Sequence, residues 1–161
     1  MSCTPDGILF NTIRYETISA IDDGKVIHGE GFAETTDPKQ RNLSLNLMLE
    51  GRRTNEDYLI TLGYFSAGQE KSYTRFQTNE PFLNKKQLII PYIALAIDTG
   101  GDAIIGSYSI DTNYINLLTI EKISWTRVKG HGQFRFIKTF GSTEDTITLT
   151  DIRFEVKKYQ N

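Results

Sequence analysis

The chain has 161 residues, of which 39% are hydrophobic and 24% charged, as in one folded domain of ~100–200 residues. Its 18 lysines and arginines face 20 aspartates and glutamates and are scattered along the sequence, which argues against the basic surface of a nucleic-acid-binding protein. No apolar run approaches the ~20 residues of a membrane helix.

The N-terminus carries the only cysteine, Cys3, so no disulfide can form within the chain. Ser2-Cys3 followed by the polar stretch Thr4-Pro5-Asp6 is similar to the end of a bacterial lipobox, in which a small residue precedes the lipidated cysteine. This interpretation requires the basic and apolar parts of a signal peptide upstream. It predicts residues 1–10 as a tether, residues 11–161 as one domain and attachment to a membrane only through the lipid. The alternative is a cytoplasmic protein with an incidental free thiol.

His28 and Glu30 are candidate metal ligands, because they share one face of the strand-like segment Val26–Phe32. A structural zinc site needs three or four ligands, so this pair predicts no metal site. His131, the second histidine, lies between two glycines and is expected at an exposed hairpin tip.

Alternation of apolar with small or polar residues is the main structural signal, and it predicts strands at 43–49, 93–97 and 147–156. The phase of the last segment changes at Thr150-Asp151, which predicts a β-bulge. Between these strands, Asn79–Lys86 could form one helical turn. On these faces we expect a buried core of Leu45, Leu47, Ile93, Leu95, Ile97, Trp125, Phe134, Phe136 and Phe154.

Turn signals separate the apolar segments at the spacing of an all-β fold. We therefore predict an antiparallel β-sandwich of about ten strands with at most one short helical turn. The clearest signals are Asp22-Asp23-Gly24, Asp37-Pro38, residues 98–102, residues 111–113 and Gly130-His131-Gly132.

One sequence motif suggests catalysis. Leu95–Asp102 contains Asp98-Thr99-Gly100 after apolar residues and resembles the catalytic loop of aspartic proteases. That chemistry needs two aspartates sharing a proton, so a single copy would require a homodimer that uses Asp98. The alternative interpretation of this motif is an ordinary hairpin turn built from Asp and Gly.

Aromatic residues offer a lead toward binding. Tyr92, Tyr108 and Tyr114 lie near turn signals and could stack on a sugar or a peptide, and Trp125 could join them as an exposed platform. Aromatic residues in sheets more often pack in the core, and Trp125 shares its parity with Ile123.

The C-terminal half resembles an uncharacterised family of small all-β bacterial lipoprotein domains. The similar segments are Ile105–Ile110, Gly132–Phe136 and Ile147–Phe154. The resemblance implies a lipidated protein of the cell envelope, with Cys3 as the acylated residue, and it carries over no catalytic residues.

Together these observations predict a non-catalytic binding or structural module at a bacterial cell envelope, without a cofactor. Its expected partner is a glycan or an envelope protein, and no nucleic acid. Two alternatives remain open: the dimeric aspartic protease, and a subunit-interaction protein without a small ligand.

Overall fold

A computed structural model describes residues 17–37, 42–66, 70–78, 91–100, 103–141 and 144–159. In these residues the chain forms strands joined by turns, and none of its segments is a helix long and apolar enough to span a membrane. The helical turn expected near Asn79–Lys86 lies outside them. The strands are β1 (Thr17–Asp22), β2 (Lys25–Asp37), β3 (Asn42–Glu50), β4 (Asp57–Ser66), β5 (Ser72–Tyr73), β6 (Tyr92–Asp98), β7 (Ile104–Ile110), β8 (Leu117–Ile123), β9 (Arg127–Gly141) and β10 (Thr146–Tyr159).

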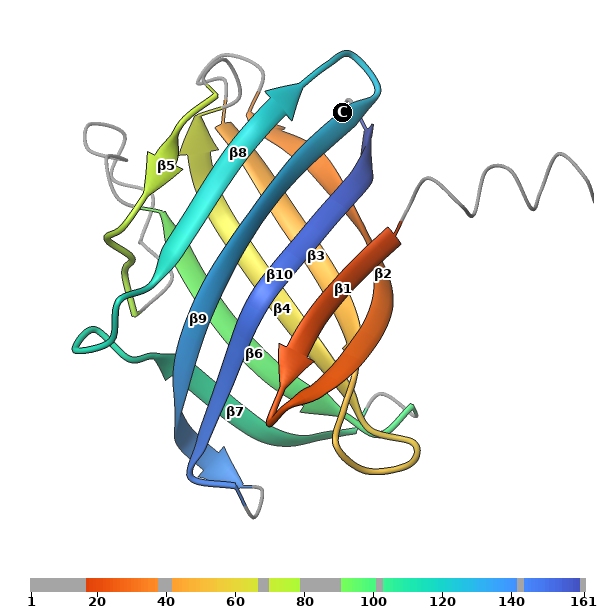
Figure 1. Cartoon of the computed structure of the whole chain (residues 1–161), viewed down its shortest axis with the longest axis vertical. Coiled ribbons are helices and arrows are strands. Elements are labelled where there is room, and N and C mark those ends of the chain that lie inside the picture. Colours follow the sequence, from red (N-terminus) through yellow and green to blue (C-terminus); the bar gives the residue numbers. More distant parts are fainter. Residues whose placement is uncertain are drawn as a thin grey trace, which may run out of the picture.

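All ten strands belong to one sheet, in the order β1-β10-β2-β3-β4-β6-β7-β9-β8-β5. Additional pairings of β1 with β2 and of β10 with β9 return the hydrogen-bonded ladder to its start. Every pairing between strands is antiparallel except the short contact between β10 and β2. Figure 1 shows β8, β9, β10 and β1 crossing in front of β3, β4 and β6, so one continuous sheet supplies two facing layers. The predicted all-β, sandwich-like class with about ten strands is confirmed.

The core lies between these layers, and the alternating residues fill it as expected. Leu43, Leu45, Leu47 and Leu49 of β3 all point inward and are buried. Burying apolar side chains contributes roughly 25 cal/mol per Å² removed from water, so this alternation fixes which face of each strand turns inward. Of the nine residues predicted for the core, eight are buried: Leu45, Leu47, Ile93, Leu95, Ile97, Phe134, Phe136 and Phe154.

Trp125 corrects that prediction, because 79% of its surface is exposed. Strand β8 ends at Ile123, and Ser124 accepts the Arg127 main-chain N–H on its hydroxyl, at 3.1 Å, in the turn to β9. The period of two holds only while the chain is extended, so parity with Ile123 says nothing about a residue in the turn.

The phase change at Thr150-Asp151 is a β-bulge, as predicted. The register of β10 with β9 shifts between Leu149 and Ile152, and Asp151 has a φ of 46°. The turn at Asp22-Asp23-Gly24 is also confirmed, with φ of 49° at Asp23 and 78° at Gly24 joining β1 to β2.

Gly130, His131 and Gly132 do not form the turn that the sequence predicted. All three residues lie inside β9. Gly130 and Gly132 face the core. A Cβ at Gly130 would lie 2.3 Å from the Thr119 carbonyl oxygen and 2.6 Å from the Phe154 ring. Glycine is therefore required here by close packing and not by a turn.

A polar cluster ties the end of the sheet at which β1 ends and β4 begins. The buried Asp22 carboxylate accepts hydrogen bonds from Arg52 Nε (2.9 Å) and a terminal guanidinium nitrogen (2.8 Å), and from the Tyr58 hydroxyl (2.8 Å). Burial, followed by the hydrogen bond to Asp22, raises the pKa of the Tyr58 hydroxyl well above its ordinary value. The same hydrogen-bonded carboxylate raises the pKa of Arg52. This cluster holds the β1–β2 turn to the β3–β4 loop.

Candidate binding site

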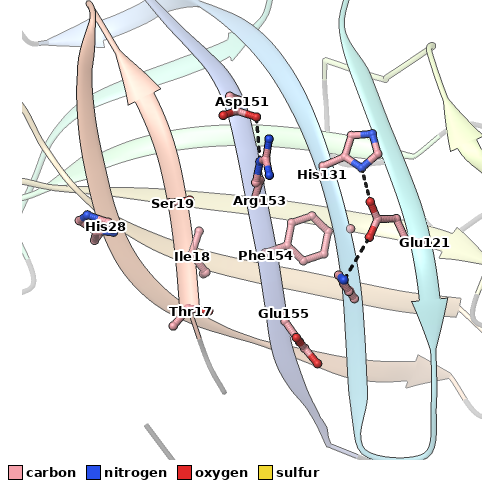
Figure 2. A pocket seen from close by; sticks show the side chains of 12 residues that line it. Thr17, Ile18, Ser19, His28, Glu121, His131, Asp151, Arg153, Phe154 and Glu155 are labelled. Atoms are coloured by element: carbon pink, nitrogen blue, oxygen red, sulfur yellow. Dashed lines mark hydrogen bonds and ion pairs between the residues drawn. The ribbon is translucent and has the colours of Figure 1, made fainter. Parts of the chain in front are cut away.

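A hollow of about 690 Å³ lies over the outer face of β2, β1, β10, β9 and β8 (Figure 2). Strand register places His28, Ser19, Arg153 and His131 in one row across four neighbouring strands. Both histidines of the chain therefore line this hollow, and His131 is not at a hairpin tip.

Five of the titratable side chains that line this hollow are paired with one another. His131 Nδ1 lies 2.7 Å from Glu121 Oε1, Lys129 Nζ lies 3.8 Å from Glu121 Oε2, and Arg153 Nε donates to Asp151 Oδ1 at 2.9 Å, as drawn in Figure 2. All of these side chains are largely exposed, so each pair contributes little to stability.

The spacing of the row limits the chemistry that this hollow can perform. His28 and His131 are three strands apart, roughly 14 Å at ~4.8 Å per strand, too far to share one metal ion. Ser19 lies directly opposite His28, and Thr119 lies directly opposite His131, but among the described residues neither hydroxyl is hydrogen-bonded to the imidazole opposite it. Within the described ranges, no three His, Cys, Asp or Glu side chains gather closely enough to hold a metal.

A second depression lies on the outer face of the other layer and consists of two adjoining hollows. One, of about 470 Å³, is lined by β2, β3 and β4 residues together with Tyr159, and the other, of about 520 Å³, by residues of β2, β3, β4, β6 and β7. Both hollows include Asn46, Leu59 and Thr61. We call the combined depression the outer groove.

Strand register explains the floor of the outer groove. Phe32, Asn46, Thr61, Ala94 and Ser109 lie opposite one another across β2, β3, β4, β6 and β7. The neighbouring row is Glu30, Met48, Leu59, Ala96 and Ser107. The side chains of the central strands are uncharged, and those on β6 and β7 in these rows are small, so the rows form the floor of a shallow trough.

Aromatic rings stand at both ends of the outer groove. At the β2 end, the rings of Phe32 and Tyr159 meet edge to face with centroids 6.0 Å apart, and 40% and 46% of these residues are exposed. Tyr92, half-buried on β6, lines the other end. Glu30 and Glu34 are the only charged residues among the described lining residues of either hollow.

The structure separates the four aromatic residues predicted to bind. Tyr92 alone lines the outer groove. Tyr108 is 1% exposed and its hydroxyl donates to the Glu144 carbonyl at 2.8 Å, so its ring is not available for stacking. Tyr114 lies in the β7–β8 connection with the Arg135 guanidinium 4.4 Å from its ring centre, and Trp125 lies in the β8–β9 turn.

Asp98 ends β6 on the outer face, and its Oδ1 accepts the Gly100 N–H at 3.1 Å. Asp57 is directly opposite it, and no hydrogen bond joins these two described carboxylates. Cys3, the predicted acylation site, lies outside the described residues.

Sequence reasoning found Tyr92 but missed Phe32, Asn46, Thr61 and Tyr159. Asn46 and Thr61 could have been assigned to outward faces, because each interrupts a run of inward apolar residues. That they lie side by side follows only from the register of β3 with β4. Searches of family models, curated proteins and solved structures found no match to this chain.

Proposed function

We propose that the protein is a non-catalytic binding module whose outer groove takes a neutral glycan. The observation that carries this proposal is the trough of uncharged polar and apolar side chains between aromatic rings, with Asn46 and Thr61 at its centre. Ligand sites usually combine apolar surface with a few placed polar groups, and the outer groove has this composition.

The chemistry of a sugar ring suits both parts of the groove. Its C–H face packs on an aromatic ring, while its hydroxyls donate to and accept from amide and hydroxyl side chains such as Asn46 and Thr61. Phe32 and Ala94 are three strands apart, roughly 14 Å at ~4.8 Å per strand, so the groove has room for an oligosaccharide.

The charges at the margin favour a neutral ligand over an anionic one. Glu30 and Glu34 line the hollows, and no lysine or arginine does so among the described residues. Carboxylates or sulfates on a glycan would meet like charge here, and Lys157, whose Nζ lies 5.0 Å from the centre of the Tyr159 ring, is near one end of the groove but does not line it.

Isothermal titration calorimetry with neutral oligosaccharides, and with uronic-acid oligosaccharides of equal length, tests the proposal. We expect binding of a neutral member only. Phe32→Ala and Asn46→Ala should each weaken it by about tenfold, which corresponds to ~1.4 kcal/mol. Phe140→Ala is the matched control, because Phe140 is 64% exposed and lies outside both hollows.

Tighter binding of the uronic-acid series, or no binding of any neutral member, would contradict the assignment of a neutral glycan. Equal losses in Phe32→Ala and Phe140→Ala would show that the ligand does not sit in the outer groove. Circular dichroism of each variant checks that the β signal is retained.

The proposal includes a place at a bacterial cell envelope, with Cys3 acylated, and its support is the sequence Ser2-Cys3 before a polar stretch. Expression of the gene with its natural upstream region, followed by membrane fractionation and mass spectrometry, tests this part. An unmodified Cys3 in the soluble fraction would exclude the anchor and leave the glycan assignment untouched.

A further inference from the structure

Trp125 is the only tryptophan of the chain and is 79% exposed in the turn between β8 and β9. Figure 1 shows this turn at the top, beside the end of β10. There the Lys158 N–H donates a hydrogen bond to the Thr126 carbonyl at 2.7 Å. A single exposed apolar side chain is ordinary on a protein surface, so Trp125 indicates a partner only together with the charges around it.

The strands next to Trp125 bring cations together. Arg127 on β9 lies directly opposite Lys157 on β10, and Lys122 on β8 lies directly opposite Lys129. Like charges facing each other across strands destabilise a sheet, so two such pairs at one end are a cost to the isolated protein. Glu121 lies 3.8 Å from Lys129, and Glu155 lies opposite Lys129 on β10, so carboxylates offset part of this charge.

The opposite end of the sheet carries the reverse arrangement. Asp57 at the start of β4 lies between Glu50 at the end of β3 and Asp98 at the end of β6. Cation pairs at one end and facing carboxylates at the other give the molecule an electric polarity that orients it toward an anionic surface.

We propose that the end formed by Trp125, Lys122, Arg127 and Lys157 docks on an anionic lipid bilayer. Tryptophan favours the headgroup region, where its ring is buried and its N–H stays hydrated, and lysine and arginine are attracted to anionic lipids. A soluble polyanion would use the cations alone and would give the exposed indole no apolar environment. Lys157 Nζ lies 5.0 Å from the centre of the Tyr159 ring, so this surface adjoins the β2 end of the outer groove, but the proposal does not depend on the glycan assignment.

The start of β1 fits the same orientation. Thr17 lies opposite Glu155, which in turn lies opposite Lys129, so β1 starts on the register row of one of the cation pairs. Cys3 itself lies outside the described residues, and an acyl chain on it would bind membranes independently of the docking surface. To keep the two effects apart, the test uses the full chain with Cys3→Ser.

Trp125 emission is the natural readout, because no other tryptophan contributes. Phosphatidylcholine vesicles with an equal part of phosphatidylglycerol should shift the emission to the blue, and vesicles of phosphatidylcholine alone should not. Each lysine near such a surface contributes about 1 kcal/mol, a factor of about five, so Lys122→Gln/Lys157→Gln should weaken co-sedimentation roughly 25-fold. Trp125→Ala should weaken it roughly tenfold.

Lys25→Gln, at the exposed start of β2 and the far end of the sheet, is the matched control and should bind as the parent does. Equal binding to both vesicle types, an unshifted emission, or equal loss in Lys25→Gln and in Lys122→Gln/Lys157→Gln would overturn the proposal. Binding to heparin without binding to anionic vesicles would also overturn it, in favour of a soluble polyanion.

Discussion

The buried carboxylate of Asp22 gives the strongest prediction about stability. Only 1% of its side-chain surface is exposed, and Arg52 holds it with two hydrogen bonds of 2.8 and 2.9 Å. Arg52→Met keeps the length and the apolar stem of the side chain but removes both donors. Among the described residues, the hydroxyl of Tyr58 is then the remaining hydrogen-bond donor to the carboxylate.

The expected loss follows from the geometry. A hydrogen bond to a charged group contributes ~1.5–3 kcal/mol, and breaking a buried ion pair costs ~3–5 kcal/mol. The Arg52 side chain is 29% exposed, so water can replace part of what is lost. We expect the free energy of unfolding to fall by about 3 kcal/mol in Arg52→Met.

Glu144 provides an internal control, because it binds the same guanidinium at 3.0 Å from an exposed position. Glu144→Gln should cost less than about 1 kcal/mol, as exposed ion pairs do. Urea unfolding of both variants, with unchanged slopes, supplies the two free energies. Equal losses in the two variants, or a loss below ~1 kcal/mol in Arg52→Met, would refute the reasoning that burial of the partner decides the energy.

Three further predictions concern Tyr58, Gly130 and Asp57. Folding raises the pKa of Tyr58 above its ordinary value of ~10, so the hydroxyl contributes its full stabilisation below about pH 10. Above that pH the free energy of unfolding should fall by up to ~1.4 kcal/mol per pH unit. Tyr58→Phe should reduce this slope, which urea unfolding at a series of alkaline pH values measures. Gly130→Ala should lower the thermal midpoint through a loss of ~1–3 kcal/mol, since its Cβ would lie 2.3 Å from a carbonyl oxygen, whereas Gly63→Ala, with no atom nearer than 4.0 Å, should not. Asp57→Asn removes a like-charge pair with Asp98 and should raise stability by ~0.2–1 kcal/mol in low salt, an effect that disappears at high salt.

Local sequence determined the class of the fold and much of its core. The alternation at 43–49 and 93–97 requires one buried face, because a strand turns successive side chains to opposite sides. The bulge at Thr150-Asp151 was also readable, since an extra residue shifts the phase of the apolar positions that follow. These features depend on neighbours along the chain.

Residue composition led to a wrong prediction where a glycine was required by close packing and not by a turn. Gly130 and Gly132 indicated a turn, but they lie inside β9, where neighbouring backbone and the Phe154 ring leave no room for a side chain. Trp125 matched the parity of a strand that had already ended at Ile123. The sequence alone does not distinguish a glycine required for close packing from a glycine required for a positive φ angle.

Only the tertiary structure decided which residues meet. Phe32, Asn46, Thr61 and Ala94 lie on four strands and form one row because the register of each pairing is fixed by the apolar face of both partners. The same holds for the basic residues, which are scattered along the chain but include the opposed pair Arg127 and Lys157. The pattern within each strand is local, whereas register depends on packing between strands far apart in the sequence.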